Sequence, residues 1–158
     1  MSKPTIRVEH VNPFIQSTME TFKKMVGVEA KPGKLEMKRD SGLGYDISGI
    51  IGISGNAKGM ISLSFPRDTA IKVTNKFVGM DNTDISDDTI DAIGELANII
   101  AGYAKKELTS LNISISLPSV VMGDNHRVKE PKDVFSFVVP FSTELGKFDL
   151  AVSLKSDT

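Results

Sequence analysis

Cysteine is absent from this chain of 158 residues. Its absence excludes disulfide bonds, thiolate metal sites and a cysteine nucleophile. The first residues, "MSKPTIRVEHVNPF", contain no apolar run of the kind found in signal peptides, and no later run approaches membrane-spanning length. An excess of one charge is also missing, because the formal net charge is −1, so nothing favours nucleic acid or an anionic membrane as a partner. We therefore expect a cytoplasmic protein.

What the sequence does contain is the composition of a globular domain. Hydrophobic residues make up 40% of the chain and charged residues 25%, a balance that allows a core to be buried. The length is that of one domain. Because no linker or low-complexity segment divides the chain, residues 1–158 are predicted to form a single domain.

Three stretches have helical periodicity. In "VNPFIQSTMETFKKMVG" apolar residues repeat on one face, with Asn12 as the expected N-cap and Pro13 at the first helical position. The stretch "RDTAIKVTNKFVG" is predicted to be a helix that ends at Gly79. A third helix follows the acidic loop "MDNTDISDD", with Ser86 or Asp87 as its cap.

Other stretches alternate between apolar and polar residues, as strands do. "KLEMKR" alternates, and "YDISGIIGISGNAKGMISLSFP" predicts two strands around a turn at Gly55 and Asn56. Further on, "NISISLP", "VFSFVVPF" and "KFDLAVSL" predict three more strands, with the polar and mobile segment "MGDNHRVKEPKD" between the first two. Pro140 indicates an edge strand, a bulge or an interrupted register.

The predicted order is therefore one helix, three strands, two helices and three strands. Strands grouped in this way favour an α+β fold with a largely antiparallel sheet over a doubly wound fold.

The third helix, "DAIGELANIIAGYAKKEL", has an unusual outer side. Apolar residues share one broad arc at about 100° per residue: Ile90, Ile93, Leu96, Ala97, Ile100, Ala104 and Leu108. The narrow remaining arc carries Asp91, Glu95, Asn98, Gly102, Lys105, Lys106 and Thr109. Two glycines, Gly94 and Gly102, need a reason, because glycine inside a helix costs about 1 kcal/mol relative to alanine.

Glu95 and Asn98 are three residues apart, so their Cβ atoms are expected roughly 5–6 Å from each other. The pair has no nucleophile beside it, and one carboxylate does not hold a catalytic metal. An asparagine can hold a water through its amide, and a glutamate can accept a charge-assisted hydrogen bond from lysine or arginine. Either the pair belongs to a solvated helix face, which is the commoner case, or the rest of the chemistry arrives on a partner.

The residues "DAIGELANIIAG" resemble the D/S-x-x-x-E-x-x-N signature of the CheC, CheX and FliY phosphatases of bacterial chemotaxis, with Asp91, Glu95 and Asn98 at the motif positions. The strand pair "GIIGISGNAKGMISLSFP" resembles the glycine-punctuated hairpin of that family, and the order of elements is similar over nearly the whole chain. The family motif continues to a proline beyond the helix, for which Pro118 is the candidate. The first helix has no Glu-x-x-Asn, and one motif per chain makes the resemblance to CheX-type members the closest.

This resemblance implies a phosphatase that hydrolyses the aspartyl phosphate of a CheY-type response regulator. Asn98 would orient the attacking water and Glu95 would bond the regulator's lysine, so these two are the expected catalytic residues. Mg²⁺ is expected on the regulator, and neither a cofactor nor a metal site is expected on this chain.

The resemblance also implies how the chain folds and assembles. It implies two long helices and one shorter helix packed on the antiparallel sheet. It implies a homodimer, and we expect the strands around Pro140 and in "KFDLAVSL" to pair across it. Further contacts with the regulator are expected on the third helix, at Asp91, Gly94, Gly102 and Lys105.

Other functions have less support in the sequence. A non-catalytic docking or adaptor module, which binds a regulator or a flagellar switch protein without hydrolysis, is the main alternative. A small-molecule sensor has no convergent polar cluster in its favour. His10 and His126 each stand in a polar stretch and are expected to be surface residues. The acid-rich loop "MDNTDISDD" lacks the central glycine and terminal glutamate of a calcium-binding EF-hand.

Overall fold

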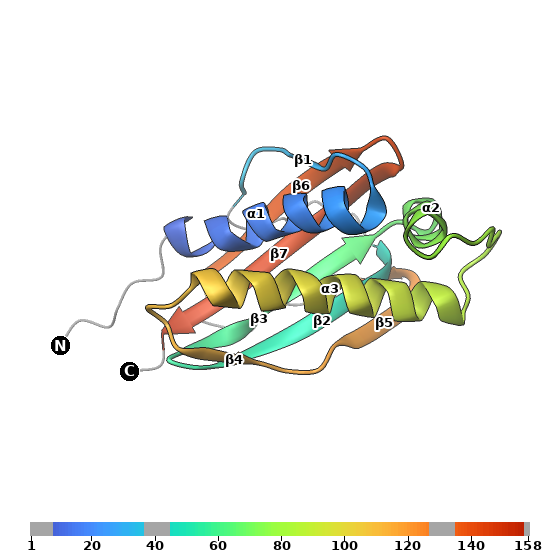
Figure 1. Ribbon diagram of the computed structural model, residues 1–158. Coiled ribbons are helices and arrows are strands. Elements are labelled where there is room, and N and C mark those ends of the chain that lie inside the picture. Colours follow the sequence, from blue (N-terminus) through green and yellow to red (C-terminus); the bar gives the residue numbers. More distant parts are fainter. Residues whose placement is uncertain (1–7, 37–44, 127–134, 157–158) are drawn as a thin grey trace.

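The computed structural model describes residues 8–36, 45–126 and 135–156. The helical segments are η1 (Val8–His10), α1 (Asn12–Thr21), the π-helical η2 (Phe22–Val26), α2 (Arg67–Val78) and α3 (Asp87–Glu107). The strands are β1 (Lys31–Pro32), β2 (Tyr45–Gly55), β3 (Ala57–Phe65), β4 (Ile113–Ile115), β5 (Ser119–His126), β6 (Phe135–Thr143) and β7 (Gly146–Ser156). Within these residues, one antiparallel sheet carries two long helical segments across one face (α1 continued by η2, and α3) and the shorter α2 at one end (Figure 1).

The sheet has the order β1-β6-β7-β3-β2-β4, and β5 also pairs with β2. Every pairing is antiparallel, which confirms the predicted α+β class. The predicted turn at Gly55 and Asn56 joins β2 to β3, and a second turn at Gly146 joins β6 to β7. Both glycines have positive φ angles, +107° at Gly55 and +130° at Gly146. Glycine adopts such angles at low cost, whereas other residues are strained there.

The core lies between the sheet and the helices. Phe148 of β7 is its centre, with ring centroids 4.6 Å from Phe22, 5.0 Å from Phe65 and 5.1 Å from Phe141. These four rings come from η2 and from the strands β3, β6 and β7, and they are almost completely buried. They therefore connect the N-terminal helical segment to three strands of the sheet through one apolar cluster. Aromatic pairs at such distances stabilise a core beyond the area that they bury.

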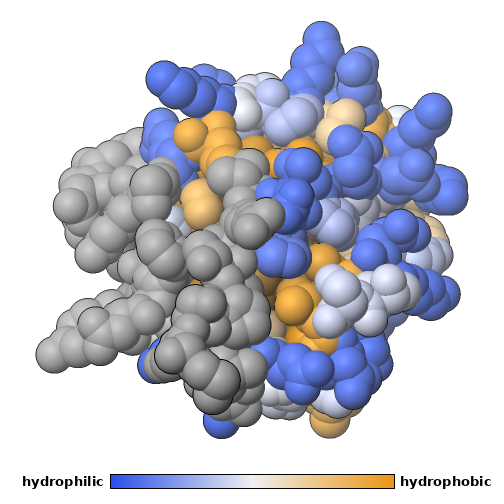
Figure 2. Space-filling view, turned by 90° about the vertical axis from the view of Figure 1, so that its left-hand side faces the viewer, coloured by the Kyte–Doolittle hydropathy of each residue, from blue (hydrophilic) through white to orange (hydrophobic). Residues whose placement is uncertain are grey.

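One end of the molecule is mainly polar where its residues are described. Figure 2 looks onto the end at which α3 finishes, and outside the atoms drawn in grey its apolar residues show as separate patches among hydrophilic ones. Scattered exposed apolar residues of this kind are ordinary on globular proteins. Of the helices among the described residues, none is both long and apolar enough to cross a membrane.

Two predictions about local structure are wrong. Val11, and not Asn12, is the N-cap of α1, and no side chain caps that helix. The segment predicted as a polar mobile loop begins inside β5, which pairs with β2 from Ser119 to His126. The alternation of "KLEMKR" is matched by a single bridge, Glu36 to Val138, and residues 37–39 lie outside the described residues.

The strand order also corrects the predicted dimer edge. β7 is paired with β6 on one side and β3 on the other, so its backbone has no free edge with which to recruit a second copy. Pro140 does lie next to an edge: its carbonyl accepts a hydrogen bond from the N–H of Gly33, beside the two-residue strand β1. The nitrogen of Pro140, which has no hydrogen to donate, therefore lies on the side of β6 that faces the short strand β1. Proline in a sheet is expected at or near such an edge. A homodimer joined elsewhere stays a prediction.

Candidate active site on helix α3

The predicted site residues form one stripe along the outside of α3. Asp91, Glu95, Asn98, Gly102 and Lys105 are separated by four, three, four and three residues, the spacing of a single helical face. Glu95 and Asp91 are exposed, as is Lys105, while Asn98 and Gly102 are half-buried. Figure 1 shows α3 on the outside of the molecule beside α1, so this stripe faces away from the sheet.

The opposite side of α3 is buried as predicted. Ile93, Leu96, Ala97, Ile100 and Ala104 have no exposed surface. An apolar stripe of this width fixes the rotation of the helix about its own axis. The burial of these side chains therefore determines that Glu95 and Asn98 point outwards.

The side chains of Glu95 and Asn98 have no partner in the part of the chain that the structure describes. No described residue makes a hydrogen bond or ion pair with either side chain. Exposed polar groups without protein partners are hydrogen-bonded to water. The carboxylate and the amide are thus available to another molecule.

Glycine in β2 lets α3 lie close to the sheet. A Cβ on Gly49 would lie 3.0 Å from the carbonyl oxygen of Ile93 and 3.1 Å from the Cβ of Ala97. Both distances are tighter than ordinary packing allows, so α3 contacts the backbone of β2 at this position. The two helix residues flank Glu95 in sequence, and the contact fixes the height of the pair above the sheet.

Both sides of α3 are held as well. On one side, the buried hydroxyl of Ser17 in α1 donates a hydrogen bond to the carbonyl oxygen of Ile100, at 2.7 Å. On the other side, a Cβ on Gly94 would lie 3.3 Å from Val120 Cγ2 and 3.8 Å from the ring of Pro118. These contacts prevent sideways movement of the helix turns that carry Glu95 and Asn98.

The two glycines of α3 have different surroundings. Gly94 is buried, and its lack of a side chain makes room for β5 and the segment before it in the same chain; its role in binding a partner stays a prediction. A Cβ on Gly102 would meet nothing within 4 Å. Only Gly102 therefore leaves open space on the surface of the helix.

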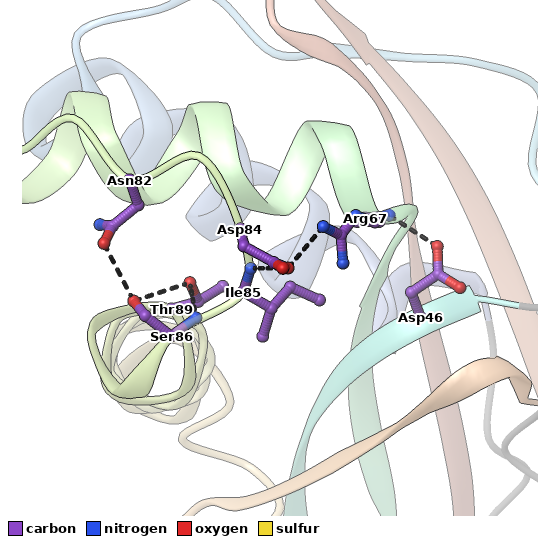
Figure 3. Close-up of polar contacts among 7 residues, drawn as sticks. All are labelled: Asp46, Arg67, Asn82, Asp84, Ile85, Ser86 and Thr89. Atoms are coloured by element: carbon purple, nitrogen blue, oxygen red, sulfur yellow. Dashed lines mark hydrogen bonds and ion pairs between the residues drawn. The ribbon is translucent and has the colours of Figure 1, made fainter.

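The start of α3 is fixed by a polar network that extends to three other elements, and Figure 3 shows its contacts with β2 and α2. Asp46 of β2 accepts hydrogen bonds from the backbone N–H groups of Arg67, at 2.7 Å, and Asn125, at 3.2 Å. The guanidinium of Arg67 forms an ion pair with Asp84, whose carboxylate also accepts the N–H of Ile85 at 2.6 Å. This chain of contacts joins β5, β2 and α2 to the loop that leads into α3.

Ser86 ends that loop as the N-cap of α3, one of the two caps that the sequence allows. Its N–H donates to Thr89 Oγ1 at 3.0 Å, and its own hydroxyl donates to Asn82 Oδ1 at 3.1 Å. Reciprocal contacts between the cap and the third helical residue satisfy backbone donors that would otherwise lack a partner.

Thr89→Val is expected to lower the free energy of unfolding by about 1 kcal/mol, because valine keeps the shape of the buried threonine but leaves the Ser86 N–H without its acceptor. Urea denaturation measures the change. The control is Thr83→Val in the exposed part of the same loop, which should stay within about 0.5 kcal/mol of the wild type. Equal stability of Thr89→Val and wild type would show that the cap contributes nothing.

Comparison with known proteins gives this site its context. A family model described as "Chemotaxis phosphatase CheX" matches residues 47–142, which include the whole of α3. The chain belongs to the CheX family. Its sequence is 33% identical over 149 residues to the CheY-P phosphatase CheX of Thermotoga maritima, a match that covers 92% of this chain and 96% of that protein.

Crystal structures of CheX proteins have the same fold. The chemotaxis protein CheX of Vibrio vulnificus matches with a TM-score of 0.88 and 28% identity, over 94% of this chain and 100% of that one. CheX in a CheX–CheY–BeF₃–Mg²⁺ complex from Borrelia burgdorferi matches with a TM-score of 0.80 over 95% of this chain and 100% of that one, and at 24% identity it shows the shared fold. The predicted family and fold are thus confirmed.

Other features of this CheX-family chain were not visible in its sequence. His126 is not an isolated surface residue, because its Nε2 lies 2.8 Å from the buried hydroxyl of Ser48 and joins β5 to β2. An open groove of about 490 Å³ runs along the surface between α1 and the C-terminal half of α3, with Glu20, Tyr103 and Lys106 among its lining residues.

Within the described ranges, no three histidine or carboxylate side chains gather in a way that could hold a metal ion.

Proposed function

We propose that the protein hydrolyses the aspartyl phosphate of a CheY-type response regulator, with Asn98 and Glu95 as its catalytic residues. The observation that carries the proposal is the Glu95–Asn98 pair, whose side chains have no partner among the described residues and lie on the outside of a helix held on three sides. The CheX relative from Thermotoga maritima, which is named a CheY-P phosphatase, supports the same reaction. A cytoplasmic location, predicted from the sequence, is part of the proposal.

The reaction needs little from this chain beyond position. A water attacks the phosphorus atom, the bond between phosphorus and the aspartate oxygen breaks, and inorganic phosphate and a free carboxylate result. Orientation of the water and neutralisation of the phosphoryl oxygens provide most of the rate enhancement in such transfers. Asn98 has no titratable group, so its role is to hold the attacking water through the amide.

Glu95 has a different role. Its exposed carboxylate has no partner among the described residues, and a lysine of the regulator would supply one. Such a charge-assisted hydrogen bond fixes the orientation of two proteins as well as contributing affinity. Because Glu95 precedes Asn98 by nearly one turn, the bond would place Asn98 beside the phosphoryl group. Mg²⁺ would come with the regulator.

The ends of the stripe on α3 carry opposite charges. Asp91 lies in its N-terminal part and Lys105, fourteen residues later, in its C-terminal part, about 21 Å away at 1.5 Å per residue. A regulator that lies along the stripe would present basic groups towards Asp91 and acidic groups towards Lys105. Complementary charges of this kind favour one of the two possible orientations of a partner.

Gly102→Ala is expected to stabilise the protein and weaken its binding to the regulator. Alanine in place of glycine inside a helix raises the free energy of unfolding by about 0.5–1 kcal/mol, and the new methyl group meets none of the described residues within 4 Å. It does fill space against which the regulator is proposed to lie. Chemical denaturation and the dissociation constant for the regulator measure the two effects. A stabilised variant that binds as tightly as wild type would remove Gly102 from the interface.

Release of inorganic phosphate from a phosphorylated CheY-type regulator, with and without this protein, tests the proposed function. Faster release in its presence supports the proposal. Binding of the regulator without faster release would support the docking or adaptor module instead.

A further inference from the structure

Leu117 is the most exposed large apolar side chain among the described residues. It is 87% exposed, and the next, Met122, is 50% exposed. An exposed leucine is common on protein surfaces and by itself indicates nothing. Two further observations distinguish this one: its backbone is fixed, and it lies beside the proposed active site.

Hydrogen bonds to β2 hold the backbone at Leu117. The N–H of Ser116 donates to the carbonyl oxygen of Gly52 at 2.9 Å, and the N–H of Gly52 donates to the hydroxyl of Ser116 at 2.8 Å. That hydroxyl in turn donates to the carbonyl oxygen of Leu117 at 2.8 Å. Pro118 then restricts the backbone on the other side. The side chain therefore extends into solvent from an ordered segment, and a partner would not need to order that segment on binding.

The position of this segment follows from its contacts with α3. Pro118 and Val120 lie against Gly94, which immediately precedes Glu95 and is one helical turn before Asn98. In Figure 1 the connection between β4 and β5 runs along the flank of α3, with β4 near its C-terminal half and β5 near its N-terminal half. A protein that covers Glu95 and Asn98 therefore reaches Leu117 as well.

We propose that Leu117 is a binding contact for the phosphorylated response regulator. This inference rests on the proposed function, because it takes the regulator to be the protein that covers α3. The regulator would present an apolar side chain next to its phosphorylation site, and the two side chains would be buried together. Removing a leucine side chain from such a contact should weaken binding about 10- to 100-fold.

Leu117→Asp and Leu117→Ala test the contact. The dissociation constant for the regulator and the turnover at saturating regulator are measured separately. Both variants should raise the dissociation constant, Leu117→Asp by about tenfold or more, and both should leave turnover at saturation within about twofold of wild type. Met80→Asp is the matched control, because Met80 is 47% exposed and lies just after α2, in the loop that leads into α3. It should bind as wild type does.

Several outcomes would overturn the inference. Unchanged affinity of both Leu117 variants would do so, and so would an equal loss of affinity in Met80→Asp. If Leu117→Asp converts a dimer to a monomer in sedimentation while regulator affinity is unchanged, the contact belongs to a second copy of the chain. A different outcome would contradict the proposed function. If the wild type binds the regulator tightly through Leu117 but does not accelerate phosphate release, the contact is supported and catalysis is contradicted.

Discussion

Asn98→Ala is expected to lower the rate of regulator dephosphorylation by about 100-fold or more, towards the regulator's own slow rate. Removing one well-placed polar group from a site that stabilises a transition state has an effect of this size. Folding should be unchanged, because the Asn98 side chain has no hydrogen-bond partner within the part of the chain that the structure describes. Phosphate release at saturating protein measures the rate, and a separate titration measures binding, which should change little.

Two variants make the result specific. Asn98→Asp keeps the size of the side chain but places a negative charge beside the phosphoryl group, so it should restore little activity. Thr109→Ala changes another exposed polar residue just beyond the end of α3 and should leave the rate unaltered. If Asn98→Ala dephosphorylates the regulator as fast as an active wild type, the role of Asn98 is wrong. If neither protein accelerates phosphate release, the docking module becomes the better account.

Glu95→Ala is expected to weaken binding of the regulator and lower turnover together. Truncating one partner of a charge pair that becomes desolvated in a complex costs about 2–5 kcal/mol of binding free energy. In the free protein Glu95 is exposed, so the cost should appear only in the complex and not as a loss of stability. Binding and phosphate release are measured on the same preparations.

Glu107→Ala is the matched control for this prediction. Glu107 is an exposed glutamate on the same helix, three turns further on, where it lines the groove beside α1. Its replacement should change neither quantity. Glu95→Gln should lie between wild type and alanine, because the amide keeps an acceptor but loses the charge. If Glu95→Ala matches wild type in both measurements, the glutamate only faces solvent.

Much of the site could be predicted because a helix shows its geometry in its sequence. Each apolar residue of α3 that was assigned to the buried arc is buried or half-buried, and the remaining arc faces outwards. The period of 3.6 residues connects neighbours in sequence to neighbours in space, so the relative positions of Glu95 and Asn98 need no tertiary information.

The contacts that hold α3 could not be predicted in the same way. Ser17 is 83 residues from Ile100, and Gly49 is 44 residues from Ile93; such contacts depend on the packing of the whole domain. The strand β5 was missed because its residues are mostly exposed and do not alternate between apolar and polar as in a half-buried strand. The function of Gly94 in packing was hidden for the same reason, since Val120 and Pro118 come from that part of the chain.

The place of β7 in the sheet has a consequence for folding during synthesis. β7 separates β3 from β6, although about eighty residues of chain lie between the end of β3 and the start of β7. Until residues 146–156 have been made, the hairpin of β2 and β3 keeps an unpaired edge, and unpaired edges of this kind promote aggregation in nascent chains. Because Phe148 joins Phe22 only at that point, the N-terminal helix also waits for the last strand. The domain should therefore form in one late step, after α3 and its stripe of proposed site residues have already been synthesised.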